Sequence, residues 1–215
     1  MVIFVDDMSA DGTGDAVKRY SRQQMDDGAT LSIVLYERDA AEGTGLSSAV
    51  VKGFSLAKRN VICAMDADLS HSPTELRRNI NYFYGNSLDL LIGSRYLKNS
   101  LIIHWPVSRK ILSKLSNILA RVLLGVPVKD YTNGYRFYSL KAAKKIIFKC
   151  NKPGGGFIIL SEIILVLWKS GFKISEIKTI FRNRTRGESS VNLSLVAQSL
   201  IGLLKLYLIK KSSKI

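Results

Sequence analysis

The first half of the chain alternates short apolar runs with segments that carry apolar residues at helical spacing. Four of these runs are continuous and partly β-branched, which is typical of buried strands. They lie at residues 2–7, 31–38, 61–65 and 88–96. Helices are expected within the intervening segments at residues 8–24, 40–57 and 72–84. This alternation predicts an α/β fold with three layers and a mostly parallel sheet.

The second half of the chain is more helical and more apolar. Residues 108–125 show helical periodicity with a broad apolar face, and residues 128–139 are expected to form a loop with a charged turn. Residues 154–171 predict a loop followed by a very apolar helix, in which Glu162 is the only acidic residue. Residues 173–184 predict a further strand. The α/β pattern therefore continues, with long apolar helices added to it.

The last element, residues 191–211, is about long enough to cross a bilayer, which takes roughly 20 residues. A narrow polar stripe interrupts it every three or four positions, formed by Ser194, Gln198, Gly202 and Lys205. Because Lys205 would lie well inside a membrane, the pattern favours an amphipathic helix in the membrane interface, followed by a basic tail. A core helix of the domain and a spanning helix are the alternatives.

Positive charge is concentrated in the last third of the chain. The net charge is +15, and residues 141–215 alone contain 15 Lys or Arg against 3 Glu. This excess points to an anionic partner, which could be a nucleotide, a nucleic acid or a membrane with anionic lipids. The two cysteines, Cys63 and Cys150, lack the spacing of a metal site and fit reduced thiols facing the cytosol.

Charged side chains follow several of the predicted strands. Asp7 ends the first, Asp66 and Asp68 follow the third, and Arg95 follows the fourth. Because parallel strands end at one edge of a sheet, these groups could converge there, together with Arg184. Carboxylates that hold a divalent cation, combined with arginines, would make a binding site for a diphosphate. The simpler alternative is a strand and a turn, in which Asp68 or Ser72 caps the helix that starts near Pro73.

Five stretches of the sequence resemble one enzyme family. They are VDDMSADGT, MDADLSHSP, GSRY, SRKILSKLSNILARVLLGVPVKDYTNGYR and FRNRTRGES. In this order and spacing they look like the dolichol-phosphate mannose synthases, which are inverting glycosyltransferases of family 2 with a GT-A fold. The resemblance runs from residue 2 to about residue 208. It implies a glycosyltransferase domain at residues 1–190 and an amphipathic membrane-interface helix with a basic tail at residues 191–215.

The resemblance also implies the roles of individual residues. Asp66 and Asp68, with Ser70, match the motif that holds Mg²⁺ or Mn²⁺. The nucleotide part of the donor would be held by Val5, Asp7, Asp66, Ala67, Asp68 and Arg184. The phosphate of the acceptor would be held by Arg95, Arg109 and Ser113. Asp68 and Arg95 are the residues expected to act directly in catalysis.

The implied reaction transfers a sugar, mannose from GDP-mannose by preference, to a polyprenyl phosphate with inversion. A lipid phosphate is already an anion at neutral pH, so no general base is needed and none is nominated, His71 included. Positioning and charge relief by the metal and the arginines suffice. Transfer of glucose from UDP-glucose to the same kind of lipid is the alternative. A phosphatase-like α/β domain and a nucleic-acid-binding module fit the basic helices less well, so no nucleic-acid partner is expected.

Two departures from the family pattern bear on activity. The family begins with a further strand, inside the sheet beside the strand matching residues 2–7, and this sequence lacks it. A truncated chain is the favoured interpretation, and an inactive relative is the alternative. Ser190 stands where the family has a lysine on the donor phosphates. The expected location is peripheral, on the cytoplasmic face of a membrane, and the need for a small membrane subunit stays open.

Overall fold

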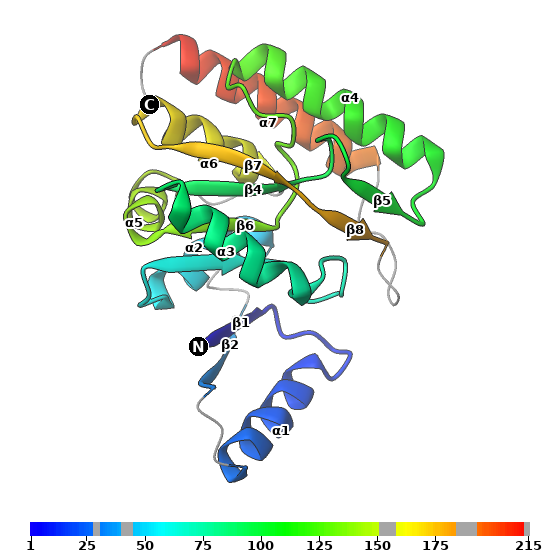
Figure 1. The fold of residues 1–215 in the computed structure, drawn as a ribbon. Helices are drawn as coiled ribbons and strands as arrows, with labels where there is room; N and C mark the ends of the chain where they lie inside the picture. The colour runs from blue at the N-terminus through cyan, green and yellow to red at the C-terminus, as the bar shows by residue number, and fades with distance from the viewer. Residues whose placement is uncertain (28–30, 40–44, 151–157, 184–192, 213–215) are drawn as a thin grey trace.

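The computed structural model describes residues 1–27, 31–39, 45–150, 158–183 and 193–212. Its elements alternate between strand and helix through most of the chain (Figure 1). In chain order they are β1 (Val2–Asp6), α1 (Thr13–Asp26), β2 (Ile33–Glu37), α2 (Leu46–Leu56), β3 (Val61–Ala64), the 3₁₀ turn η2 (Pro73–Glu75), α3 (Leu76–Gly85), β4 (Leu90–Ser94), β5 (Leu101–Ile103), α4 (Val107–Leu124), β6 (Arg136–Ser139), α5 (Leu140–Lys149), α6 (Ile158–Lys169), β7 (Ile174–Lys178), β8 (Ile180–Arg182) and α7 (Leu193–Lys211).

The main sheet has four strands in the order β3-β6-β4-β7. β4 and β7 are parallel, whereas β6 runs antiparallel to both of its neighbours. The prediction of a loop over residues 128–139 was therefore wrong at its end, because this segment supplies a central strand. Its polar residues suggested exposure, yet Arg136 is completely buried. A smaller parallel pair, β5 with β8, extends beside the main sheet.

Strands β1 and β2 form a separate parallel pair, which carries α1 (Figure 1). Helix α2 spans this pair and the main sheet, since Gly53 lies against Val5 of β1 while Phe54 packs edge-on against Tyr138 of β6. Among the described residues, no strand pairs with the outer edge of β3 or with the edge of β1 that faces away from β2. Tyr20 on α1 is exposed, because α1 has only the two-stranded pair to pack against.

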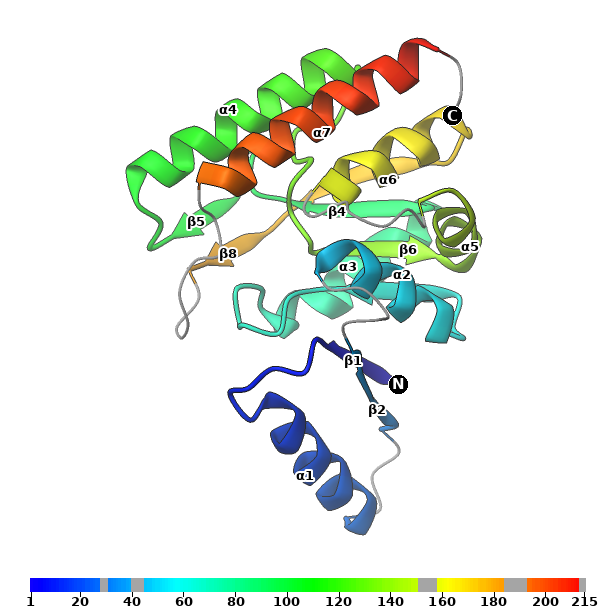
Figure 2. The ribbon, with the colours of Figure 1, turned by 180° about the vertical axis from the view of Figure 1, so that it is seen from behind.

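The core has two parts, one on each face of the main sheet. Leu90 and Ile92 of β4 belong to the larger part, with α6, and Leu91 belongs to the smaller part, with Phe83 of α3. All three β4 side chains are completely buried. Helix α6 is buried around most of its circumference, because it packs against the sheet and lies beside α5 and α7 (Figure 2). The sequence predicted this helix as very apolar, and its all-round burial explains why it shows little amphipathic pattern.

Helices α4 and α7 lie side by side on the face of α6 away from the sheet (Figures 1 and 2). Gly202 allows a close approach, since a Cβ there would be 2.9 Å from Cγ1 of Ile158 on α6. Leu203 and Leu206 of α7 are buried in the core. At the far end, the Lys210 ammonium donates to the carbonyl oxygen of Leu123, near the end of α4.

The outer surface of this helix pair, here called the α4–α7 face, exposes many large apolar side chains. From α4 these are Val107, Ile111, Leu112, Leu115, Ile118, Leu119 and Val122; from α7 they are Leu200, Ile201, Leu204 and Leu208. Exposed apolar side chains in this number on one pair of helices are typical of a site that meets a membrane or another protein. None of the helices among the described residues combines the length and apolar character that a membrane span requires.

Candidate active site

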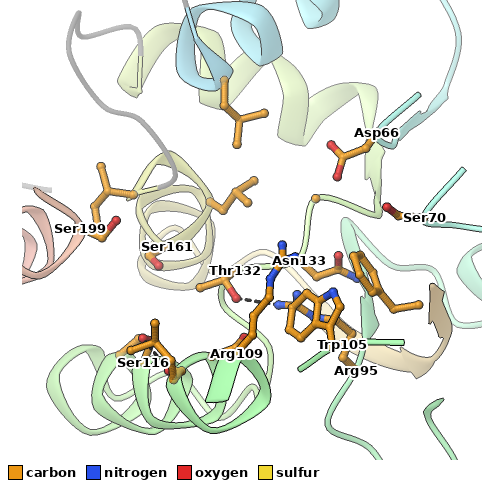
Figure 3. A pocket seen from close by; sticks show the side chains of 18 of the residues that line it. Asp66, Ser70, Arg95, Trp105, Arg109, Ser116, Thr132, Asn133, Ser161 and Ser199 are labelled. Atoms are coloured by element: carbon orange, nitrogen blue, oxygen red, sulfur yellow. Dashed lines mark hydrogen bonds between the residues drawn. The ribbon is translucent and has the colours of Figure 1, made fainter. Parts of the chain in front are cut away.

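A pocket opens between the main sheet and the helices α4, α6 and α7 (Figure 3). Its polar end is formed by residues that follow β3 and β4, and its apolar end by the helices. The polar end and the adjoining wall include Asp66, Asp68, Ser70, Arg95, Trp105, Arg109, Ser113, Thr132, Asn133 and Gly134. The pocket therefore joins acidic, basic and apolar surfaces within one space.

The acidic part of the pocket contains Asp66, Asp68 and Ser70, directly after β3. The Asp68 carboxylate accepts the backbone N–H of Ser70 at 3.0 Å, which fixes the turn after the strand. Gly134 lies opposite, and a Cβ at this position would come within 3.5 Å of an Asp66 oxygen. Two carboxylates and a hydroxyl beside an open space are the oxygen ligands that Mg²⁺ or Mn²⁺ prefers. Hard cations of this kind often bind through one or two carboxylates together with substrate phosphates.

Arg95 and Asp130 form an ion pair in the buried wall of the pocket. Nε of Arg95 donates to Oδ2 of Asp130 and Nη2 donates to Oδ1, both at 2.9 Å. Nη2 also donates to Oγ1 of Thr132 at 2.6 Å. Burial opposes the charge of Arg95, but the carboxylate beside it outweighs burial and raises its pKa. Burial likewise works against the Asp130 charge, yet Arg95 and several N–H donors lower its pKa. Both groups stay charged at neutral pH.

Arg109 and Trp105 lie next to this pair, at the beginning of α4. The Arg109 guanidinium lies 4.3 Å from the centre of the Trp105 ring and donates to Oδ1 of Asn183 at 3.2 Å. The Arg95 guanidinium lies 5.3 Å from the same ring. Trp105 also packs edge-on against Phe181 of β8, with ring centres 5.0 Å apart. Two cations therefore share one aromatic ring at the pocket wall.

The loop from Asp130 to Tyr135 is held by buried hydrogen bonds. Glu176 of β7 accepts the backbone N–H groups of Lys129 and Asp130 at 2.8 and 3.0 Å. The Arg136 guanidinium donates to the backbone oxygens of Asn133, Tyr131 and Leu160, at 2.7 to 2.8 Å. Arg136 thus ties the loop to the first turn of α6, so the two sides of the pocket are fixed relative to each other.

The opposite end of the pocket is apolar, with hydroxyl groups interspersed. Its apolar lining comes from Leu46, Leu112, Ala120, Ile158, Leu160, Leu200 and Leu203. The hydroxyl-bearing residues there are Ser113, Ser116, Ser161 and Ser199, contributed by α4, α6 and α7. Ser113 also accepts a hydrogen bond of 2.6 Å from the Tyr96 hydroxyl. Because Leu112 and Leu200 also belong to the α4–α7 face, this end of the pocket continues into that surface.

Six residues expected to be functional line this one pocket: Asp66, Asp68, Ser70, Arg95, Arg109 and Ser113. Val5, Asp7 and Ala67 do not line it, and Arg184 lies outside the described residues. Asp7 instead forms an ion pair with the buried Arg38 and accepts the backbone N–H of Gly45 at 2.8 Å. A role of Val5 and Asp7 in holding the nucleotide stays a prediction.

Four residues that build or support the pocket were not predicted from the sequence: Trp105, Asp130, Thr132 and Asn133. A polar segment that carries two aromatic residues, KDYTNGY, was the available signal, since such a segment is unusual in an exposed loop. His71 does not line the pocket. It is completely buried and stacked on Tyr135, and burial lowers its pKa to about 4, so it is neutral at pH 7.

Solved structures share this fold. The structure of glucosyl-3-phosphoglycerate synthase from Mycobacterium tuberculosis with Mn²⁺, UDP-glucose and phosphoglyceric acid matches with a TM-score of 0.65 at 16% identity. The match covers 95% of this chain and 68% of that one. The complex of the same enzyme with Mn²⁺ and UDP-glucose gives a TM-score of 0.62 at 16% identity, over 95% and 67% of the two chains. At this identity the match concerns the fold, and it confirms the predicted three-layer GT-A architecture.

The fold and the pocket together define a GT-A glycosyltransferase domain. Residues 1–147 match the family described as glycosyl transferase family 2, and the chain belongs to this family. The polyprenol monophosphomannose synthase of Mycolicibacterium smegmatis is 32% identical over 202 residues, which is 93% of this chain and 73% of that protein. The undecaprenyl-phosphate mannosyltransferase of Micrococcus luteus is 30% identical over 204 residues, 93% of this chain and 79% of that protein.

A third relative is the dolichol-phosphate mannosyltransferase of Pyrococcus furiosus, which is 32% identical over 192 residues. The match takes in 88% of this chain but spans half of that protein's length. These relatives confirm the resemblance that the sequence motifs indicated.

Proposed function

We propose that this chain transfers mannose from GDP-mannose to a polyprenyl phosphate, with inversion at the anomeric carbon. One observation carries the proposal: a single pocket joins two carboxylates, two arginines and an apolar end. The carboxylates would hold the metal ion that a nucleotide sugar needs. The arginines would bind an anionic acceptor, and the apolar end would accommodate a lipid tail. The names of the relatives from Mycolicibacterium smegmatis and Micrococcus luteus support a polyprenyl phosphate as acceptor and mannose as the sugar.

Asp66, Asp68 and Ser70 are the residues that would hold a divalent cation, either Mg²⁺ or Mn²⁺. When bound, the cation would neutralise the donor diphosphate and stabilise the nucleoside diphosphate as it leaves. The two carboxylates line the polar end of the pocket, and Gly134, which has no side chain, leaves room beside Asp66. The structures of glucosyl-3-phosphoglycerate synthase, which has a similar fold, contain Mn²⁺ and support a metal of this class.

Arg109 and Ser113 would hold the phosphate of the acceptor, with Arg95 at the wall behind them. An oxygen of this phosphate attacks the anomeric carbon from the face opposite the leaving diphosphate, which forms one carbon–oxygen bond and breaks another. The phosphate is an anion at neutral pH, so no protein group has to remove a proton. The protein contributes positioning and compensation of charge, which are the larger effects in such reactions.

The acceptor's hydrocarbon tail would leave the pocket at its apolar end, next to the α4–α7 face. We propose that this face rests on a membrane that contains the polyprenyl phosphate, on the cytoplasmic side where nucleotide sugars occur. The apolar side chains on both helices support this, and so do the basic residues that flank them, Lys114, Arg121 and Lys211 among them.

The test is transfer of labelled mannose from GDP-mannose to undecaprenyl phosphate in the presence of Mn²⁺, with UDP-glucose in a parallel reaction. We expect mannose transfer, its loss on chelation, and a loss of at least a hundredfold in Asp68→Ala, with only a small loss of thermal stability from the hydrogen bond to Ser70. Asp15→Asn, an exposed acid in the first turn of α1, is the matched control and should keep full activity.

Full activity of Asp68→Ala would overturn the assignment of the metal site. Transfer of glucose but not of mannose would replace the proposed donor with UDP-glucose. A folded chain that transfers neither sugar would overturn the proposed activity.

A further inference from the structure

The indole nitrogen of Trp105 is buried at the pocket and has no part in the reaction proposed above. Its side chain is 8% exposed, and its indole nitrogen is completely covered. No hydrogen-bond acceptor for this N–H occurs among the described residues. A buried donor without a partner is costly, so such atoms are rare unless a ligand satisfies them.

The surroundings of this N–H indicate what kind of group it would bind. The Trp105 ring lies beside the guanidinium groups of both Arg95 and Arg109 (Figure 3). The N-terminal turn of α4 follows directly after Pro106, and the first N–H groups of a helix attract negative charge. An N–H donor among two cations and a helix N-terminus fits an anionic oxygen.

The two arginines lie at different distances from the Trp105 ring. Arg95 is bound at two points by the buried Asp130 carboxylate, and its guanidinium lies 5.3 Å from the ring centre. Arg109 is half-buried, donates to the neutral amide of Asn183, and lies 4.3 Å from the ring centre. The ring therefore supports Arg109 more closely than Arg95.

We propose that Trp105 binds the phosphate of the acceptor: its ring positions Arg109, and its indole N–H donates to a phosphate oxygen. This rests on the proposed function and names a further binding residue for it. The nitrogen is covered in this structure, so binding includes a shift of neighbouring side chains.

The chain offers a direct optical test, because it contains only two tryptophans. In a Trp168→Phe variant, which changes an exposed residue of α6, Trp105 is the sole tryptophan emitter. We expect farnesyl phosphate to change its emission saturably, while farnesol at the same concentrations and GDP with Mn²⁺ do not. Equal responses to farnesol and farnesyl phosphate would overturn the proposal, and so would a response to GDP alone.

Steady-state kinetics separate binding from a merely structural role. Trp105→Phe keeps an aromatic ring but loses the N–H, so the KM for polyprenyl phosphate should rise about tenfold, as expected for a lost hydrogen bond to a charged group. The KM for the donor and kcat should stay within twofold of wild type. Trp105→Leu, which also removes the support of Arg109, should raise the acceptor KM further. Trp168→Phe is the matched control and should match wild type.

An unchanged acceptor KM in Trp105→Phe, or a rise in the donor KM instead, would overturn the assignment. The emission titration needs no turnover. A chain that binds farnesyl phosphate through Trp105 but transfers no sugar would therefore refute the proposed activity while leaving the assignment of Trp105 in place.

Discussion

Asp130 holds Arg95 by its backbone as well as by its side chain. Oδ2 of Asp130 accepts both the backbone N–H and Nε of Arg95, each at 2.9 Å, while Oδ1 accepts Nη2 at the same distance. Oδ1 also accepts the backbone N–H groups of Thr132 and Asn133. One completely buried carboxylate thus fixes the end of β4, an arginine and the loop that forms the pocket wall.

Asp130→Asn should destabilise the protein by about 3–5 kcal/mol, because it leaves the buried Arg95 charge without compensation. Urea unfolding measures this. Glu37→Gln is the matched control, since it removes the exposed partner of Lys18 and should cost less than about 1 kcal/mol. The double variant Arg95→Met with Asp130→Asn removes the uncompensated charge and keeps an oxygen for the backbone N–H groups, so it should recover much of the lost stability but little of the transfer activity. Equal losses in Asp130→Asn and Glu37→Gln would contradict this account.

The α4–α7 face should bind membranes through its apolar side chains. Leu204→Glu with Leu208→Glu changes two exposed residues of α7 that do not line the pocket. Each leucine buried in lipid contributes about 1.5–3 kcal/mol, so we expect the liposome-bound fraction to fall at least about tenfold in a flotation assay. Met25→Glu with Phe148→Glu, on α1 and α5, makes the same change of charge and should leave binding intact. Similar losses in both double variants would refute a role of this particular face.

His71 should make the stability of the fold depend on pH. Its pKa falls from 6.5 to about 4 on folding, chiefly because it is buried. The unfolded chain therefore binds more protons than the folded one between these values. The contribution of neutral His71 to the free energy of unfolding is fully present above pH 6.5. It is lost as pH falls toward 4, by up to about 3 kcal/mol.

Urea midpoints measured from pH 7.5 down to pH 4.5 check this dependence. His71→Phe retains stacking on Tyr135 and Phe181 but cannot titrate, so its stability should change much less over this range. His104→Asn is the matched control: His104 is the only other histidine, it is exposed, and its positive φ of 60° suits asparagine. The pH dependence should persist in this variant. Its persistence in His71→Phe would assign the effect to other groups.

Periodicity predicted most of the elements, because an apolar run or an apolar stripe reports directly which face is buried. It failed at residues 128–139, where Asp130, Asn133 and Arg136 are polar and yet buried. Such residues are stable inside only because partners distant in sequence satisfy them, as Arg95 does for Asp130. The sequence did not predict a role for Trp105 for a related reason, because Arg95 and Arg109 come together beside its ring only in the folded chain.

The division of the sheet predicts a further measurable property. The outer edge of β3 and the free edge of β1 carry backbone groups with no strand partner among the described residues, and every residue of β3 is only half-buried. Unpaired edges exchange their amide hydrogens quickly and invite pairing with other chains.

Fusing an extended apolar segment ahead of Met1, through a loop long enough to reach the gap, should join β1 to β3 and raise Tm by several degrees. In hydrogen exchange followed by NMR, the outward amides of Val61–Ala64 and Val2–Asp6 should slow at least about tenfold, because each gains a ladder partner. The same extension with prolines at alternate positions cannot pair and is the control. Equal exchange rates in both fusions would mean that the gap does not accept a strand, and α2 alone would then hold the two sheets together.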